Sequence, residues 1–361
     1  MEEMVGQLMA EQKKIYTLKF SDLIFIAVVL VMGGIFFFKA IKAADKKNMW
    51  ADEFVALSAT VRDPHCHLLL RGGSGEGSPA PLDYLVLRGL DAIGSTVHYF
   101  GLSSNSYYRL SAIGSNLFIG AGVILFVFFF IRKKIQSGLF LALQSLCLIA
   151  ALVIFYFWPF NFQYATEMRP YALWNSLWFA SLAYFMCRGI RWPLKILLIL
   201  LALTQTASIF QLCCFCLIYI LGQWGLSVSF RDIFKNVLMT FVLPMAIALY
   251  YISCKHSDFN YGNHDVYMGQ FWNFWTNKEK IPILTVTGIC ITIAIKNMRQ
   301  SFIVFATMLL LYLVSPIINY IILAHNFFFS SRHYIYYDLI YPLFLIHFAI
   351  NLEQYLSRKV L

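Results

Sequence analysis

Apolar residues occur in long runs separated by short polar segments, and this pattern predicts a bundle of membrane-spanning helices. A span needs about 20 mostly apolar residues to cross a bilayer. Runs of this kind lie at residues 20–41, 110–131, 138–157, 171–187, 194–208, 209–225, 237–254, 281–295, 301–323 and 338–352. We therefore expect an all-α, polytopic integral membrane protein whose residues 1–361 form a single transmembrane domain. The runs amount to about ten spans.

The stretch 194–225 is long for one helix and short for two. Basic clusters flank it, at Arg188–Lys195 on one side and at Arg231–Lys235 on the other. Short connecting segments that are rich in Lys and Arg stay on the cytoplasmic side of a membrane. If both clusters are cytoplasmic, the chain crosses the membrane twice within this stretch.

Several further basic clusters give a consistent topology. They gather before the first run and in further short segments, at Lys13, Lys14, Lys19, Arg132–Lys134, Lys296, Arg299 and Arg358–Lys359. The positive-inside rule then places both termini in the cytoplasm. The first run begins near Leu18 and is too long for a signal peptide, so we expect a retained helix. Residues 42–109 become the first outer-face loop, and function is expected on that face.

Composition supports this class of protein. Apolar residues make up 60% of the chain and charged residues only 13%, against about 25% charged residues in a soluble domain. The net charge of +10 is explained by the basic clusters between spans, so it does not indicate a nucleic-acid partner. The eight cysteines lie mostly inside apolar runs and predict neither a disulfide framework nor a zinc site.

The first outer loop carries the most distinctive residues. It opens with Trp50-Ala51-Asp52-Glu53, and Phe54–Val61 then fits a short amphipathic helix lying along the membrane interface. A proline-rich tract, Pro79–Tyr84, leads into a second short apolar helix at Leu85–Ile93. Arg109 stands at the outer mouth of the second span.

The order of four motifs resembles the GT-C superfamily of membrane glycosyltransferases, and most closely the bacterial relatives of protein O-mannosyltransferases and aminoarabinose transferases. These motifs are Trp50-Ala51-Asp52-Glu53, Pro79-Ala80-Pro81-Leu82-Asp83-Tyr84, Tyr108-Arg109-Leu110 and Tyr164-Ala165-Thr166-Glu167-Met168-Arg169-Pro170-Tyr171. They cover the first half of the chain, whereas the expected topology matches over the whole. Such relatives often show His-Pro-Pro-Leu-Tyr-Tyr, so the missing His and the presence of Asp83 leave the acceptor type open.

The resemblance implies that a sugar passes from a polyprenyl-phosphate donor to an acceptor on the outer face. The first acidic residue after the first span serves as general base in that family, which here is Asp52, with Glu53 beside it. Arginines at outer helix mouths would hold the donor phosphate, namely Arg109, Arg169 and Arg332. Contacts to the sugar or acceptor are expected from Glu167, Asp83, Tyr84, Tyr171, Trp272 and Tyr334.

Several properties stay open at this stage. The acceptor is a protein, a lipid or a glycan, and a divalent metal is a possible cofactor. The family pattern leans bacterial, so we expect a protein of the inner (plasma) membrane, surrounded by lipid, with its active site on the outer face and both termini cytoplasmic.

The expected site residues have structural alternatives. Asp52 and Glu53 can simply be the start of a helix, because acidic residues favour helix N-termini. Glu167 and Arg169 can form an ion pair that closes a loop. Trp272 can belong to an aromatic belt at the membrane interface.

The arginines and the overall function also have alternatives. Arg109 and Arg332 can extend toward lipid headgroups. A transporter or flippase for a lipid-linked substrate is the alternative function, but it predicts ionisable residues and broken helices at mid-membrane depth. The predicted spans are nearly free of such residues, with His347 as the main titratable one and Pro244 as the clearest helix breaker. A scaffold without catalytic activity would not need carboxylates and arginines at the outer ends of several spans.

Overall fold

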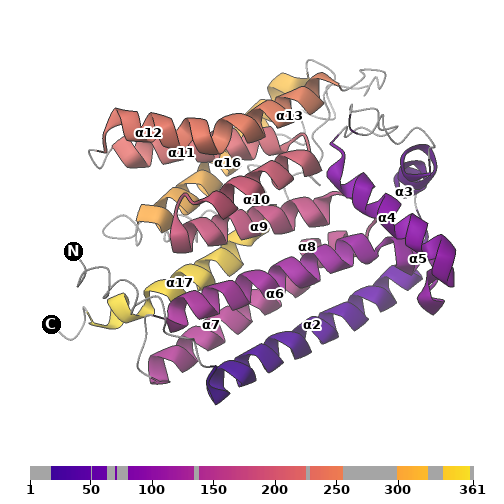
Figure 1. Ribbon diagram of the computed structural model, residues 1–361, viewed down its shortest axis with the longest axis horizontal. Helices are drawn as coiled ribbons and strands as arrows, with labels where there is room; N and C mark the ends of the chain where they lie inside the picture. The colour runs from indigo at the N-terminus through magenta and orange to yellow at the C-terminus, as the bar shows by residue number, and fades with distance from the viewer. Residues whose placement is uncertain are drawn as a thin grey trace, which may run out of the picture.

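The computed structural model describes residues 18–49, 51–62, 70, 80–133, 138–224, 228–254, 299–323 and 336–357. All regular elements within these ranges are helices, so the expected all-α class is confirmed for them. Figure 1 shows the long helices packed side by side as a bundle, with the short helices α3, α4 and α5 gathered at one end. We call this end the capped end.

The bundle is built from the longer helices. These are α2 (Phe20–Lys46), α6 (Leu110–Arg132), α7 (Gly138–Phe157), α9 (Tyr171–Arg188), α10 (Trp192–Thr204), α11 (Ser208–Trp224), α12 (Phe230–Val237), α13 (Leu243–Ser253), α16 (Arg299–Leu323) and α17 (Ile340–Ser357). A π-helical segment, Leu238–Val242, joins α12 to α13 into one continuous helix, and the expected breaker, Pro244, is the second residue of α13.

Four helices within the described ranges are long and apolar enough to cross a membrane: α2, α6, α7 and the joined helix Phe230–Ser253. They support an integral membrane protein, whereas the expected count of about ten spans stays a prediction. The run 281–295 lies outside the described residues. The run 171–187 is the helix α9, which is buried along almost its whole length and is not among the four.

The stretch 194–225 forms two helices, α10 and α11, as expected. Trp178 of α9 packs on Phe215 of α11 with ring centroids 5.8 Å apart. Further along both helices, Phe185 packs on Tyr219 at 6.3 Å. Because these contacts advance in the same direction, α9 and α11 run parallel, and α10 carries the chain back between them.

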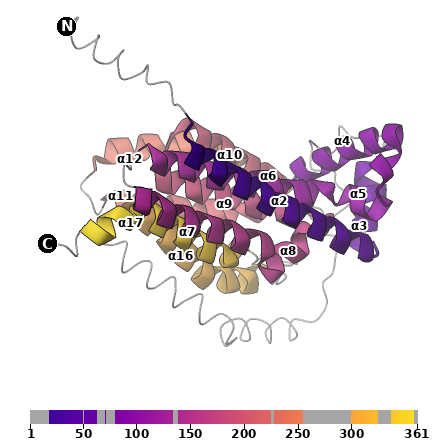
Figure 2. The same ribbon diagram turned by 90° about the horizontal axis from the view of Figure 1, so that it is seen from below.

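One ion pair relates the ends of two predicted spans. Arg132, in the last turn of α6, places its Nε 3.0 Å from Oδ1 of Asp22, which lies in the first turn of α2 and is fully buried. The start of α2 and the end of α6 therefore share one end of the bundle, opposite the capped end (Figure 1). Figure 2 shows α2 lying across the outside of the bundle, and exposed apolar residues such as Val31 and Phe38 point away from its packed face.

The capped end contains the two short helices that were expected in the first outer loop. Helix α3 (Ala51–Val55) continues into a π-helical turn (Ala56–Val61), and α4 (Leu82–Val97) is longer than the predicted 85–93. Helix α5 (Ser104–Tyr108) and a 3₁₀ turn (His98–Gly101) complete this cap. A small hydrophobic cluster, separate from the bundle core, holds it together through Ala56, Leu57, Val61, Tyr84, Leu87, Tyr107, Tyr108 and Met168.

Helix α8 (Pro159–Ala165) was not expected from the sequence, and it begins with proline at its first position, where a missing N–H costs nothing. Its Asn161 is buried between two long helices. Asn161 Nδ2 donates to Asn116 Oδ1 of α6 at 3.0 Å, and Asn175 Nδ2 of α9 donates to Asn161 Oδ1 at 3.0 Å. Interhelical amide hydrogen bonds of this kind contribute about 1 kcal/mol each in membrane proteins. They fix α8 against α6 and α9.

Candidate active site at the capped end

Glu53 of α3 and Arg109, between α5 and α6, form a two-point ion pair. Arg109 Nη2 lies 2.6 Å from Glu53 Oε2, and Arg109 Nε donates to Glu53 Oε1 at 3.0 Å. The side chain of Arg109 is 1% exposed and that of Glu53 is 0% exposed. Parallel hydrogen bonds between a guanidinium and a carboxylate are among the strongest polar contacts in proteins, and they fix the orientation of both groups.

Arg109 also binds the end of α2. Its Nη1 donates to the carbonyl oxygens of Ala44 at 2.6 Å and Lys47 at 2.8 Å, and its Nη2 donates to the carbonyl of Asn48 at 3.1 Å. A guanidinium has five N–H groups, and with the two bonds to Glu53 all of them are used. Carbonyls at a helix C-terminus carry partial negative charge, which a cation stabilises. Arg109 therefore caps α2.

These contacts bear on the two interpretations of Arg109 from the sequence. Since Arg109 is fully buried, it does not extend to lipid headgroups. Its expected contact with a donor phosphate stays a prediction, and it would require Arg109 to give up one of the bonds described above.

Glu53 connects three segments that are distant in the sequence. Its Oε1 accepts a hydrogen bond from the backbone N–H of Met168 at 2.6 Å, in addition to the bonds from Arg109. The Asp-Glu motif, the Tyr-Arg motif and the loop that contains Glu167 thus meet at one carboxylate. Asp52 precedes Glu53 in α3, and its side chain lies outside the described part of the structure.

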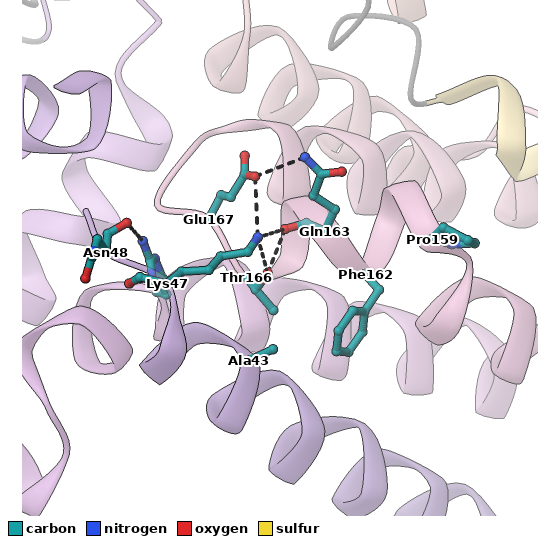
Figure 3. A pocket seen from close by; sticks show the side chains of 9 residues that line it. Ala43, Lys47, Asn48, Pro159, Phe162, Gln163, Thr166 and Glu167 are labelled. Carbon is teal, nitrogen blue, oxygen red and sulfur yellow. Dashed lines mark hydrogen bonds and ion pairs between the residues drawn. The ribbon is translucent and has the colours of Figure 1, made fainter. Parts of the chain in front are cut away.

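A cleft of about 580 Å³ opens beside this junction. Its walls come from the end of α2 on one side and from α8 with the following loop on the other (Figure 3). The lining residues are Ala43, Lys47, Asn48, Arg109, Pro159, Phe162, Gln163, Thr166 and Glu167. Of the residues expected to contact substrate, Arg109 and Glu167 line it.

Lys47 spans the cleft from the end of α2. Its Nζ donates to Thr166 Oγ1 at 2.9 Å and to the carbonyl of Gln163 at 3.4 Å, and it lies 3.5 Å from Oε1 of Glu167. Lys47 was not among the expected site residues, because a lysine just after an apolar run resembles the many basic residues that flank the other runs.

Glu167 has two oxygens in different environments. Its Oε1 faces Lys47 and accepts a hydrogen bond from Gln163 Nε2 at 3.3 Å. Its Oε2 is buried, and no hydrogen-bond donor from the described residues reaches it. Figure 3 shows this second oxygen pointing away from Lys47 and Gln163. The ion pair of Glu167 is made with Lys47 rather than with Arg169, which is half-buried and donates its backbone N–H to the carbonyl of Glu167.

The other expected contacts are separate from the cleft or undescribed. Asp83 and Tyr84 are buried in α4, where Tyr84 packs in the small cluster of the cap. Tyr171 begins α9 and meets Tyr164 edge-on, with ring centroids 5.4 Å apart. None of these three is among the residues that line the cleft. Three further expected residues, Arg332, Trp272 and Tyr334, lie outside the described residues.

A polar network on the cap holds α3, α4 and α5 together. Arg62 Nη2 donates to the hydroxyl of Tyr108 at 2.8 Å, and this hydroxyl donates to Asp91 Oδ1 at 2.5 Å. Arg62 Nε also lies 3.3 Å from the same carboxylate oxygen. The hydrogen bond to Tyr108, together with the nearby charge of Asp91, raises the pKa of Arg62, so the guanidinium stays charged.

The possible divalent metal stays a prediction. Within the described ranges, no group of three His, Cys, Asp or Glu side chains is placed to hold a metal ion. Comparison with known proteins returns no matching family model, no matching curated protein and no matching solved structure.

Proposed function

We propose that the protein is a membrane glycosyltransferase of the GT-C type, which moves a sugar from a polyprenyl-phosphate donor to an acceptor at the capped end. The observation that carries the proposal is the junction at Glu53. One buried carboxylate joins three of the segments that resemble GT-C motifs, and an open cleft lies beside it. A bundle that serves only as a scaffold has no need for such a junction at the edge of a cleft.

The proposed reaction is a single displacement with inversion. The acceptor oxygen attacks the anomeric carbon, a new carbon–oxygen bond forms, and the bond to the phosphate oxygen breaks. The electron pair of that bond leaves with polyprenyl phosphate, and the acceptor proton passes to the carboxylate of Asp52, acting as general base. Phosphate is a good leaving group, so a strong general acid is not essential.

Glu53 and Asp52 have different roles in this proposal. A catalytic group must be held rigidly, and neighbouring residues provide that support. Glu53 is bound to Arg109 and to the backbone N–H of Met168, and these two contacts hold α3 in place. Glu53 is therefore a positioning residue, and Asp52 alone is assigned the proton transfer. The donor phosphate is assigned first to Arg169 and Arg332, because a contact from Arg109 would require this residue to give up one of its bonds to Glu53 or to the end of α2.

The proposal includes the topology expected from the sequence, with the capped end on the outer face of a bacterial plasma membrane. The positive-inside pattern supports it. So does the ion pair between Asp22 and Arg132, which places two predicted cytoplasmic segments at the same end of the bundle.

Sugar transfer by the purified protein tests the function. The protein is reconstituted in lipid nanodiscs with bacterial lipid extract as acceptor source and offered undecaprenyl-phosphate donors that carry radiolabelled glucose, mannose or aminoarabinose. We expect one donor to be converted to undecaprenyl phosphate and a labelled product, and Asp52→Asn to stop this conversion. Asp232→Asn is the matched control, since Asp232 is an exposed carboxylate on α12 at the opposite end. Transport of intact donor between the leaflets of proteoliposomes, without conversion, would instead establish the flippase.

A further inference from the structure

The joined helix Phe230–Ser253 has an exposed face that runs from its first residue toward the capped end. Exposed residues recur on it as neighbouring pairs four positions apart, at 230–231, 234–235, 238–239 and 242–243. Residues four positions apart lie on the same side of a helix. Ile233 and Phe241, which fall between these pairs, are buried against the bundle. Figure 1 shows α12, where this face begins, on the outside of the bundle at the end opposite the cap.

The chemistry of this face changes along the helix. Its first two pairs are Phe230-Arg231 and Phe234-Lys235, whereas the next two are Leu238-Met239 and Val242-Leu243. The two phenylalanine rings stack on each other with centroids 6.1 Å apart, and these residues are 80% and 52% exposed. The face is therefore cationic and aromatic where it begins and wholly apolar further along the same side.

The two cations of this face lack a counter-ion. Among the residues that the structure describes, none forms a hydrogen bond or an ion pair with the side chain of Arg231 or Lys235. Asp232 lies next to Arg231 in the sequence, but its Oδ2 accepts a hydrogen bond from Ser229 Oγ at 2.7 Å. Unpaired cations that continue into an exposed apolar surface are complementary in charge and polarity to an anionic amphiphile.

Two tryptophans indicate where the membrane interface lies at this end. Trp192, the first residue of α10, and Trp224, the last residue of α11, are both largely exposed. Tryptophans gather at the boundary between membrane and water, where the lipid headgroups lie. Asn236 Nδ2 donates to the hydroxyl of Tyr219 at 3.1 Å. Because α11 and α12 run in opposite directions, this contact brings Arg231 to the depth of Trp224.

We propose that this face binds an anionic phospholipid from the leaflet at the end opposite the cap. Arg231 and Lys235 contact the headgroup phosphate, and an acyl chain lies along Leu238 and Val242. A phospholipid fits because the apolar part of the face belongs to a candidate membrane span, where acyl chains are the surrounding solvent. The site lies at the other end of the bundle from the cleft, so this inference does not depend on the proposed function.

Lipid binding by the full-length protein tests the proposal. Native mass spectrometry from detergent micelles compares dioleoyl phosphatidylglycerol, dioleoyl phosphatidylcholine, which has the same chains, and glycerophosphoglycerol, which has no chains. We expect phosphatidylglycerol to bind best and the headgroup alone to bind poorly. Arg231→Gln combined with Lys235→Gln should weaken phosphatidylglycerol binding about 30-fold, because each Lys or Arg near anionic lipid contributes about fivefold in affinity. Binding of phosphatidylcholine should stay unchanged.

A matched basic pair on another helix provides the control. Arg191, directly before α10, and Lys195, in its first turn, are also four positions apart in a predicted cytoplasmic segment. Leu198 and Ala202, seven and eleven positions after Arg191, are fully buried, so no exposed apolar surface continues from this pair. Arg191→Gln combined with Lys195→Gln removes the same charge and should bind phosphatidylglycerol as tightly as the wild type does.

Several outcomes would overturn the proposal. Equal binding of the two phospholipids by the wild type would exclude headgroup recognition, and unchanged binding after the substitutions on α12 would place the lipid elsewhere. An equal loss in the α10 control would indicate a general attraction to basic residues. Wild-type dimers that separate after the substitutions on α12 would assign this face to a second copy of the chain.

A measurement on the wild type covers the case in which the substituted protein does not fold. Phosphatidylglycerol that carries a photoactivatable diazirine in its acyl chain should label the peptide that contains residues 238–243 of the wild type. Labelling that is absent from this peptide, or that an excess of phosphatidylcholine competes away as well as phosphatidylglycerol does, would reject the site.

Discussion

Arg109 forms a two-point ion pair with the carboxylate of Glu53, although the two residues are 56 positions apart in the sequence. Both side chains are buried. The same guanidinium holds the last carbonyls of α2, so one side chain fixes the first predicted span, the cap and the start of α6 relative to one another. Buried pairs of this kind are sensitive to the loss of either partner, because the remaining charge is left without compensation.

Glu53→Gln is predicted to destabilise the protein by about 3–5 kcal/mol, the usual cost of breaking a buried ion pair. The measurement is the thermal or denaturant-induced unfolding of the protein in nanodiscs. Glu353→Gln serves as control, because Glu353 is an exposed glutamate on α17. Wild-type stability of Glu53→Gln would show that Arg109 does not depend on this counter-ion.

Asp52→Asn is predicted to lower turnover by roughly 10²–10⁴-fold, the usual contribution of a general base, because the amide keeps the shape of the side chain but cannot take the proton. Stability and donor binding should match the wild type. The check is sugar transfer by nanodisc-embedded variants, with unfolding and donor binding measured alongside. Near-normal turnover would move the base to another carboxylate, with Asp83 and Glu167 as the next candidates.

Arg332→Ala is predicted to weaken donor binding by about 1.5–3 kcal/mol, the range for a hydrogen bond to a charged group. The reason comes from the sequence, where Ser330-Ser331-Arg332-His333-Tyr334 stands at the expected outer mouth of the last span. Equilibrium binding of undecaprenyl phosphate measures the effect. The control is Arg191→Ala, in a predicted cytoplasmic segment, which should bind undecaprenyl phosphate as tightly as the wild type does. If Arg332→Ala also binds as tightly as the wild type, Arg332 is not part of the donor site.

The topology predicts which side of the membrane each end of the bundle faces. In a variant without the eight native cysteines, a cysteine at the exposed Ser95 of α4 should react with a membrane-impermeant maleimide added to intact cells. A cysteine at the exposed Arg231 of α12 should react only after the membrane is opened. The reverse labelling pattern would place the capped end in the cytoplasm and reject the proposed outer-face site.

Gly120→Ala is predicted to destabilise the packing of α6 against α7 by about 1–3 kcal/mol, as overpacked cores do. A Cβ at this position would lie 2.8 Å from the ring of Phe155 and 2.9 Å from the ring of Tyr156. At Gly122, on the same helix, a Cβ meets nothing within 4 Å, so Gly122→Ala is the matched control. Unfolding of both variants in nanodiscs gives the comparison, and equal stabilities would mean that α7 can move away from α6 at little cost.

Much of the helical architecture could be predicted because spans are marked by local apolarity alone. The predicted runs 110–131 and 138–157 agree closely with α6 and α7, which expose much of their surface and must be apolar on that account. Helix α9 was expected as one more such run. Unlike α6 and α7, it is enclosed by other helices and needs no lipid-facing surface, so it can carry Asn175 and two tryptophans.

The candidate site was less predictable, because its contacts join residues far apart in the sequence. Asp52, Glu53, Arg109 and Glu167 were expected to act together, and the structure brings Glu53 and Arg109 together with the loop of Glu167. The capping of α2 by Arg109 could not be foreseen, since it depends on where α2 ends in space. The bond from Lys47 to Thr166 spans 119 positions, and neither residue has a local pattern that indicates it.

The amide contacts of Asn161 have a consequence for how this protein can be altered by insertion or deletion. The hydrogen bonds of Asn161 fix the rotation of α8 about its own axis, and Glu167 is the second residue after the end of that helix. Each residue of an α-helix advances the chain by about 100° around the axis. One residue added between these two positions would therefore swing the carboxylate away from Lys47, whereas replacing side chains at constant length leaves its direction intact. The number of residues between Asn161 and Glu167 therefore sets the direction of the carboxylate. Substitutions in this loop are compatible with that direction only while the length of the loop is kept.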